Sequence, residues 1–118
     1  MQFKYSLIIP CFNEEGNIKY LFKNLLKLTI YKDLEIILVD NGSIDLTLQT
    51  LIFYKKKNKN LNIKIIKIKK NKGFGFGVFQ GLKKSRGKYL CYTHADREAK
   101  IIEIKKAFKI IAINSKLN

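Results

Sequence analysis

The stretch Leu34-Glu-Ile-Ile-Leu-Val39, followed by Asp40-Asn-Gly-Ser43, decides the fold. Its first part is an apolar run, which is typical of a buried strand. Its second part is a cluster of turn-forming residues, so we expect the strand to end there. Three other segments have strand composition. They are Tyr5–Ile9, which Pro10 stops, Asn62–Ile68 and Lys88–Thr93.

Between these strands, apolar residues recur at the spacing of amphipathic helices. One helix face is formed by Ile18, Leu21, Phe22, Leu25 and Leu26. A second helix, capped by Asp45, runs through Leu48, Leu51 and Ile52. A last helix presents Ile101, Ile104, Ala107, Phe108 and Ile111. The alternation predicts an α/β fold, a mainly parallel sheet with helices on both faces, in a single domain over residues 1–118.

The acidic residues are few, and five of the nine follow predicted strands. In parallel α/β sheets, ligands bind outside the carboxyl ends of the strands. Acids near helix starts also stabilise the helix dipole, which explains Glu14, Glu15 and Glu98 but explains Asp40 and Asp96 less well. These positions predict a site at one edge of the sheet.

The composition favours a soluble protein. The 118 residues carry a net charge of +15, with Arg86 and Arg97 as the only arginines. We interpret this charge mainly as a lysine-rich solvated exterior, because phosphate recognition favours the planar fork of arginine. No apolar run approaches the ~18 residues of a membrane span. The N-terminus lacks a secretory signal, and Cys11 and Cys91 form no disulfide framework. We therefore expect a cytoplasmic domain with both cysteines reduced.

Four blocks of the sequence, in this order, resemble family 2 glycosyltransferases, particularly their dolichol-phosphate-mannosyltransferase-like branch. Leu7-Ile-Ile-Pro-Cys-Phe-Asn-Glu-Glu-Gly-Asn-Ile18 resembles the opening strand and nucleotide loop of the family. Ile36–Thr47 resembles its second block, and Asn71–Gly87 is similar to its glycine-punctuated helix. Lys88–Asp96 is similar to the segment in which the family carries a metal-binding Asp-X-Asp.

The resemblance implies a GT-A fold, with the strands in the order 3-2-1-4, that binds a UDP- or GDP-linked sugar for inverting glycosyl transfer. It implies that Pro10, Phe12 and Glu14 form the wall of the base pocket. Asp40 would accept a hydrogen bond from the base or ribose, and Gly73 would lie at the nucleotide. Close packing of a helix on the sheet is an alternative explanation for Gly73 and the glycines that follow it.

The resemblance also implies a divalent metal held by His94, Asp96 and Glu98. Such a metal offsets the charge that builds on the leaving phosphates. His94 stands where the family has its first aspartate. Imidazole is a poor ligand for Mg²⁺ but acceptable to Mn²⁺, so we expect Mn²⁺ to be favoured. In the alternative without a metal, His94 is a strand-end residue and Asp96 a helix cap.

The family's catalytic domain is longer than this chain, and its second half supplies the acceptor site and the catalytic base. After Asp96, the only side-chain carboxylates are Glu98 and Glu103, and Glu103 lies on an expected helix. We therefore expect a donor-binding domain that is truncated relative to the family and lacks its base. The acceptor implied is a polyprenyl phosphate or a glycan at the inner membrane face.

A second interpretation is an RNA-binding module of the RNA-recognition-motif type. Lys72–Phe79 matches the RNP1 pattern except at Gly77, and Ile37–Asn41 lies upstream at a tolerable distance for RNP2. The phenylalanines of the first segment would then stack bases on an antiparallel sheet. RNP2 would lack its aromatic residue at Leu38, so a nucleic-acid partner is disfavoured.

Overall fold

The computed structural model of the chain describes residues 2–95 and 101–117. Strands and helices alternate along it as the sequence predicts, with a short 3₁₀ turn, η1, after the first helix. The elements are β1 (Tyr5–Cys11), α1 (Ile18–Leu25), η1 (Leu26–Leu28), β2 (Leu34–Asn41), α2 (Thr47–Lys57), β3 (Ile63–Ile68), α3 (Phe74–Lys84), β4 (Tyr89–Tyr92) and α4 (Ile101–Leu117).

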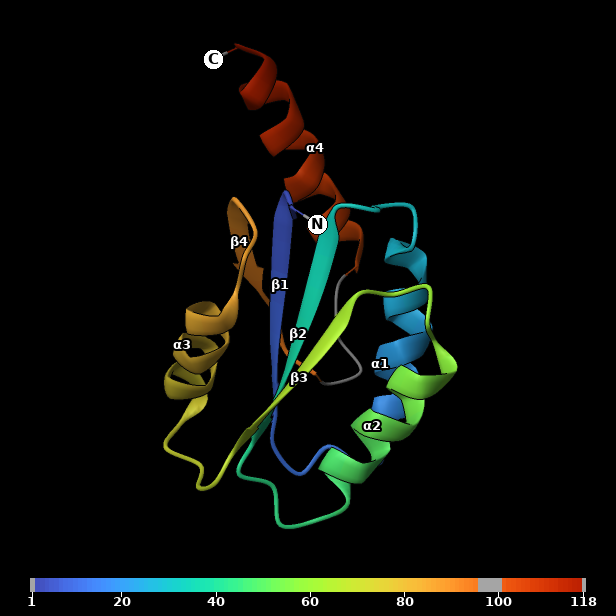
Figure 1. The fold of residues 1–118 in the computed structure, drawn as a ribbon, viewed down its shortest axis with the longest axis vertical. Coiled ribbons are helices and arrows are strands. Elements are labelled where there is room, and N and C mark those ends of the chain that lie inside the picture. Colours follow the sequence, from blue (N-terminus) through green and yellow to red (C-terminus); the bar gives the residue numbers. More distant parts are fainter. Residues whose placement is uncertain (1, 96–100, 118) are drawn as a thin grey trace.

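In the described residues the strands form one sheet in the order β3-β2-β1-β4, and all neighbouring pairs are parallel. The predicted α/β architecture and strand order are therefore confirmed. Because the strands are parallel, their carboxyl ends meet at one edge of the sheet. This edge lies at the bottom of Figure 1, where β1, β2 and β3 lead into their helices. The amino ends of the strands meet at the opposite edge.

The helices cover the two faces of the sheet unequally. Side chains from α1, α2 and α4 pack on one face and form the larger hydrophobic core around Leu7 and Phe22. On the other face α3 packs over a small cluster that includes Ile8 and Val39 (Figure 1). A Cβ on Gly81 would lie 2.5 Å from Ile8 Cγ2, so α3 can approach the sheet closely only with glycine there. None of the helices in 2–95 and 101–117 has the length and apolarity to cross a membrane.

Strand β1 continues through Pro10, where the sequence pattern predicts its end. The carbonyl of Ile8 accepts a hydrogen bond from Thr93 N, so this side of β1 faces β4. Pro10 lies two residues further along and faces the same side. The pairing with β4 ends at Ile8 and Tyr92. The missing N–H of Pro10 therefore costs the ladder no hydrogen bond, while Pro10 remains paired with Val39 of β2.

The RNA-binding interpretation is wrong. The segment proposed as RNP1 forms the start of helix α3 rather than a strand. The sheet is parallel, whereas an RNA-recognition motif presents its aromatic residues on an antiparallel one. Phe74 and Phe79 are partly exposed, but on a helix surface.

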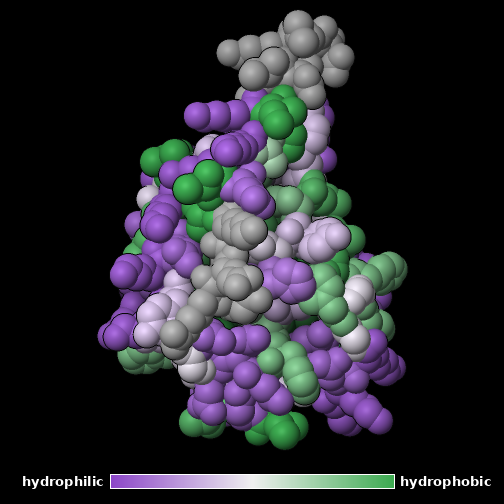
Figure 2. Space-filling view, turned by 180° about the vertical axis from the view of Figure 1, so that it is seen from behind, coloured by the Kyte–Doolittle hydropathy of each residue, from purple (hydrophilic) through white to green (hydrophobic). Residues whose placement is uncertain are grey.

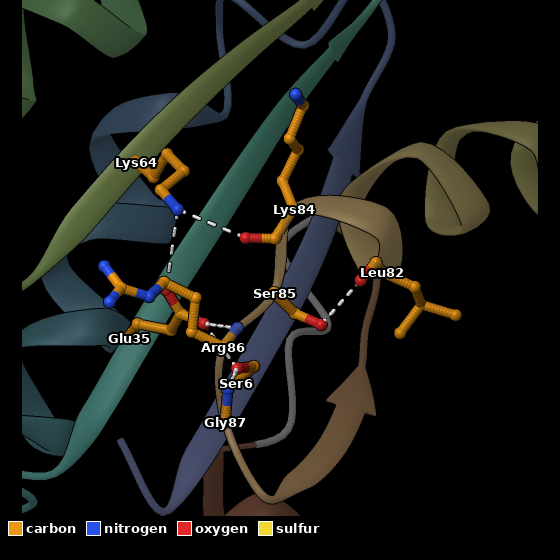
Figure 3. Close-up of polar contacts among 8 residues, drawn as sticks. All are labelled: Ser6, Glu35, Lys64, Leu82, Lys84, Ser85, Arg86 and Gly87. Carbon is orange, nitrogen blue, oxygen red and sulfur yellow. Dashed lines mark hydrogen bonds and ion pairs between the residues drawn. The ribbon is translucent and has the colours of Figure 1, made fainter. Parts of the chain in front are cut away.

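A buried carboxylate ties the amino ends of the strands together. Glu35 of β2 is 3% exposed, and its Oε2 accepts hydrogen bonds from Ser6 Oγ (2.6 Å) and from the backbone N–H of Arg86 (Figure 3). Ser6 Oγ in turn accepts the N–H of Gly87 at 2.7 Å. Lys64 Nζ of β3 lies 3.9 Å from Glu35 Oε1. The loop between α3 and β4 is thereby fixed to the sheet.

Candidate functional site

A cavity of about 250 Å³ opens at the carboxyl end of the sheet. It brings together segments that are far apart in the sequence. Four residues predicted for the site line it, namely Pro10, Phe12, Glu14 and His94. Its other lining residues are Asn41, Asn71, Phe74 and Ala95. Seen from behind, the surface over this end of the molecule is largely hydrophilic, with apolar patches among the polar side chains (Figure 2).

The wall that carries Phe12 and Glu14 is held in place by the loop between β2 and α2. Asn13, with a φ of 52°, donates its N–H to Ser43 Oγ (3.0 Å) and accepts the N–H of Ile44 on Oδ1 (2.9 Å). The N–H of Glu14 is donated to Thr47 Oγ1 at 2.9 Å. The two loops therefore brace each other, which fixes the β1–α1 turn beside the cavity.

Asp40 lies behind this wall rather than on the cavity surface. Only 2% of the residue is exposed, and its Oδ1 accepts the N–H of Ser43 at 3.2 Å. The turn that follows depends on Gly42, which has a φ of 76°. In the described structure Asp40 thus supports the loop, and its predicted contact with a nucleoside remains a prediction.

Negative charge is concentrated at this end of β1 although the chain as a whole is strongly basic. Burial raises the pKa of the Cys11 thiol well above its usual range, and the charges of Glu14 and Asp40 raise it further. Glu14 Oε2 also accepts a hydrogen bond from Asn17 Nδ2 at 2.6 Å. A cationic group would be stabilised beside these carboxylates.

Asn41 lines the cavity, and the sequence analysis missed it. The residue is 3% exposed, and its Nδ2 donates to the carbonyl of Gly73 at 3.1 Å. Its Oδ1 is buried and has no hydrogen-bond partner within the described residues. A Cβ on Gly77 would lie 2.8 Å from Asn41 Nδ2, so glycine there makes room for this amide. In the sequence Asn41 belongs to the turn-forming cluster Asp40–Ser43, so nothing there indicates that its side chain bonds to the residue before α3.

The first turn of α3 forms the opposite side of the cavity. Gly73 precedes it with a φ of 105°, which favours glycine, and its N–H is donated to Asn71 Oδ1 at 2.6 Å. Gly73 itself is not among the lining residues, but Asn71 and Phe74 on either side of it are. Packing explains Gly77 and Gly81, whereas a Cβ on Gly73 or Gly75 would have no atom within 4 Å.

Of the three predicted metal ligands, only His94 lies in the described part of the chain. Its ring stacks on Phe74, with the centroids 4.5 Å apart and the planes at 24°. Asp96 and Glu98 lie outside the described residues. Within 2–95 and 101–117, no cluster of three or more histidine, cysteine or acidic residues is placed to hold a metal. The described side chains at the cavity that carry donor atoms are His94, Glu14, Asn41 and Asn71, and their nitrogen and oxygen atoms are of the kinds that Mn²⁺ accepts.

A four-stranded parallel sheet in this order, with its cavity at the carboxyl ends of the strands, has the architecture of GT-A glycosyltransferases. The model of the family "Glycosyl transferase family 2" matches residues 6–116. The chain therefore belongs to glycosyl transferase family 2.

Two solved structures share the fold. The mannosyltransferase PcManGT from Pyrobaculum calidifontis, in complex with GDP-Man and Mn²⁺, superposes with a TM-score of 0.74 at 21% identity over 81% of this chain and 28% of that protein. Residues 1–349 of TarS from S. aureus superpose with a TM-score of 0.69 at 28% identity, over 92% of this chain and 32% of those TarS residues.

A curated relative is an uncharacterized glycosyltransferase of Synechocystis sp., which is 48% identical over 54 residues. That match covers 44% of this chain and 17% of the relative. Each of these matches thus covers less than a third of the relative's own chain.

Proposed function

We propose that this chain binds a nucleotide-diphosphate sugar and a divalent metal at the carboxyl end of the sheet, as the donor-binding part of an inverting family 2 glycosyltransferase. The observation that carries the proposal is the cavity itself, in which Pro10, Phe12 and Glu14 from β1 and its loop meet His94 from beyond β4. PcManGT, which has the same fold, is complexed with GDP-Man and Mn²⁺ and supports this choice of ligand.

In this proposal the base lies against Pro10 and Phe12, because a proline and an exposed aromatic ring offer flat apolar contacts. Asp40 and Glu14 accept hydrogen bonds from the nucleoside, and the backbone at Gly73 leaves open space for its approach. His94, Asp96 and Glu98 would hold the metal, which supplies positive charge to the diphosphate as it leaves. The stack on Phe74 orients the His94 ring for this role. Mn²⁺ is favoured over Mg²⁺ because one donor is an imidazole.

The sugar acceptor and the catalytic base belong to parts of the reaction for which the described residues provide little. Glu103, the acid on α4, is exposed on a helix and would be a poor base. We propose a polyprenyl phosphate or a glycan as acceptor at the cytoplasmic face of a membrane, as in the dolichol-phosphate-mannosyltransferase-like branch. For this chain, donor binding rather than transfer is therefore the activity to measure.

Calorimetric titration with GDP and with UDP, in Mn²⁺ and in EDTA, tests the proposal. We expect one of the two nucleotides to bind, more tightly with Mn²⁺. Phe12→Ala should weaken binding by about 1–2 kcal/mol through the loss of ring contact. Phe53→Ala is the matched control, because Phe53 is similarly exposed but lies on α2 away from the cavity. Binding of neither nucleotide, or equal losses in the two variants, would contradict the proposal.

A further inference from the structure

Two adjoining cavities lie at the amino end of the sheet, at the edge opposite to the candidate donor site. The larger, of about 550 Å³, is lined by Lys4, Asp33, Arg86 and Lys88 among others. The second, of about 290 Å³, is lined by Glu35, Lys64 and again Arg86. Phe3 also lines both cavities. We call the two together the amino-end groove.

The amino-end groove carries an excess of positive charge. Its cationic residues are Lys4, Lys64, Arg86 and Lys88, and its acidic residues are Asp33 and Glu35. The carboxylate of Glu35 already has its partners, because it accepts two hydrogen bonds and lies near the Lys64 ammonium. Lined in this way, the groove favours an anion.

Arg86 is placed to bind such an anion. It is one of two arginines in a lysine-rich chain, and the only one within residues 2–95 and 101–117. In Figure 3 its side chain extends from the α3–β4 loop past Glu35, toward the side of the sheet on which Lys64 lies. The guanidinium fork matches two oxygens of a phosphate group, which a lysine ammonium cannot do.

The backbone around the groove is fixed before any ligand arrives. Arg86 and Gly87 donate their N–H groups to Glu35 and Ser6. The rim is closed by backbone hydrogen bonds from Lys88 N to Phe3 O (3.3 Å), from Tyr89 N to Lys4 O (2.8 Å) and from Lys4 N to Asp33 O (2.8 Å). A ligand therefore need not order these segments, which lowers the free-energy cost of binding.

We propose that the amino-end groove binds a small organic phosphate, with Arg86 as the main phosphate ligand and Lys4 and Lys88 as supporting cations. The size of the larger cavity leaves room for more than a phosphate group. Phe3 and Tyr89 in its lining offer apolar contact to the organic part of the ligand. This binding is independent of the metal and of the donor site, because it uses the other end of the sheet.

The probe is phenyl phosphate, titrated in EDTA at about 0.15 M salt to screen diffuse attraction to the lysine-rich surface. Backbone amide chemical shifts of the isotope-labelled protein report where it binds. We expect saturable shifts at Gly87 and Lys88, and a Kd that rises by about tenfold in Arg86→Gln and by less in Arg86→Lys. The side chain of Arg86 is exposed and its N–H is retained in the variants, so both should fold; thermal melts check this.

The charge-matched control is Lys69→Gln, because Lys69 is exposed just after β3, at the opposite edge of the sheet. It should leave the Kd within about twofold, since one distant charge is largely screened at this salt. Equal losses in Arg86→Gln and Lys69→Gln would show nonspecific attraction and overturn the proposal, as would the absence of saturable shifts. Equally tight binding of inorganic phosphate would overturn the assignment of an organic ligand. None of these outcomes depends on whether the donor site binds a nucleotide.

Discussion

The two ends of the parallel sheet differ in how their buried polar groups are bonded. At the amino end, the Glu35 carboxylate is bonded within the chain, to Ser6 and to the backbone of Arg86. At the carboxyl end, Asn41 makes one hydrogen bond, to the carbonyl of Gly73, and its buried Oδ1 has no partner among the described residues. A buried polar group without a partner costs stability, so it needs an explanation in terms of function or of a missing partner.

We interpret this difference as a difference in role: the Glu35 contacts stabilise the fold, and the carboxyl end binds the proposed nucleotide-sugar donor. Contacts around Glu35 hold the strands and the α3–β4 loop in a fixed arrangement, which a network of satisfied polar groups does well. The carboxyl end has an open cavity, and α3 begins there without a side-chain cap; both features lower stability. Variants of the Glu35 hydrogen-bond network should therefore lower the free energy of unfolding, and variants at the carboxyl end should chiefly weaken ligand binding.

The largest expected effect is at the amino end. Glu35→Ala should lower the free energy of unfolding by about 3 kcal/mol, because Ser6 and Arg86 lose a buried acceptor. Glu35→Gln keeps an acceptor oxygen and should cost less. Urea denaturation measures both, with Glu103→Ala on the exposed surface of α4 as the control. If Glu35→Ala unfolds at the same urea concentration as the control, the amino end does not have the supporting role described here.

The next effect concerns binding at the carboxyl end. Asp96→Asn removes a charge proposed to neutralise the metal and should weaken Mn²⁺-dependent nucleotide binding by about 2 kcal/mol. Asp40→Asn should weaken binding both with Mn²⁺ and in EDTA, because its proposed partner is the nucleoside. Calorimetry separates the two cases. Binding that does not require a metal and is unaffected by Asp96→Asn would defeat the metal-site assignment.

Gly77 and Gly75 of α3 provide a matched pair of substitutions, because only the first lies against Asn41, which lines the cavity. Gly77→Ala places a Cβ against Asn41 and should destabilise the protein by about 1–2 kcal/mol and weaken nucleotide binding. Gly75→Ala points into open space and should be neutral or stabilising by up to about 1 kcal/mol, because alanine favours the helix. Thermal melts and titrations of both variants test this. Equal behaviour would mean that Asn41 is not held by its contact with α3.

The smallest effect comes from β4, between the two ends. Burial raises the pKa of the Cys91 thiol to about 11, whereas an unfolded cysteine ionises near about 8.5. Between these two pH values the Cys91 thiol therefore keeps its proton in the folded protein and loses it in the unfolded chain. The resulting contribution to stability is complete below about pH 8.5 and is lost as the pH rises to about 11.

Urea denaturation across this pH range measures the contribution of Cys91. The loss should reach about 1 kcal/mol near pH 9 and be reduced in Cys91→Ala, which lacks this thiol. The wild-type curve includes other ionisable groups, so the difference between the two proteins is the informative quantity. Identical slopes would show that the Cys91 thiol titrates normally in the folded state.

Much of the fold could be predicted because apolar spacing is a local signal. The alternation of buried strands and amphipathic helices in the sequence led to the correct architecture, and the resemblance to the family led to the correct strand order. The predicted end of β1 was wrong, because the hydrogen bond that a proline removes matters only if that side of the strand has a neighbouring strand. That is a property of the sheet and not of the residues around Pro10.

The candidate site was predicted in part for the same reason. Pro10, Phe12, Glu14 and His94 follow strands, so their convergence could be expected from a parallel sheet. Asn41 and Phe74 were missed because each acts through a residue distant in sequence, Gly73 in one case and His94 in the other. Glu35 was missed as well, since its partners include a backbone N–H that any sequence would supply.

The strand order also has a consequence for how the chain folds. β1 pairs with β2 across the shorter connection, since Tyr5 meets Leu34, whereas its pairing with β4 joins Tyr5 to Tyr89. Closing the longer loop costs more chain entropy, and such distant contacts slow folding. During synthesis, the edge of β1 that faces β4 therefore stays unpaired until Tyr89–Tyr92 have left the ribosome. The hydrogen bonds from Arg86 N–H to Glu35 and from Gly87 N–H to Ser6 belong to the same group of distant contacts, so they can form only after α3 and the loop that follows it have been made.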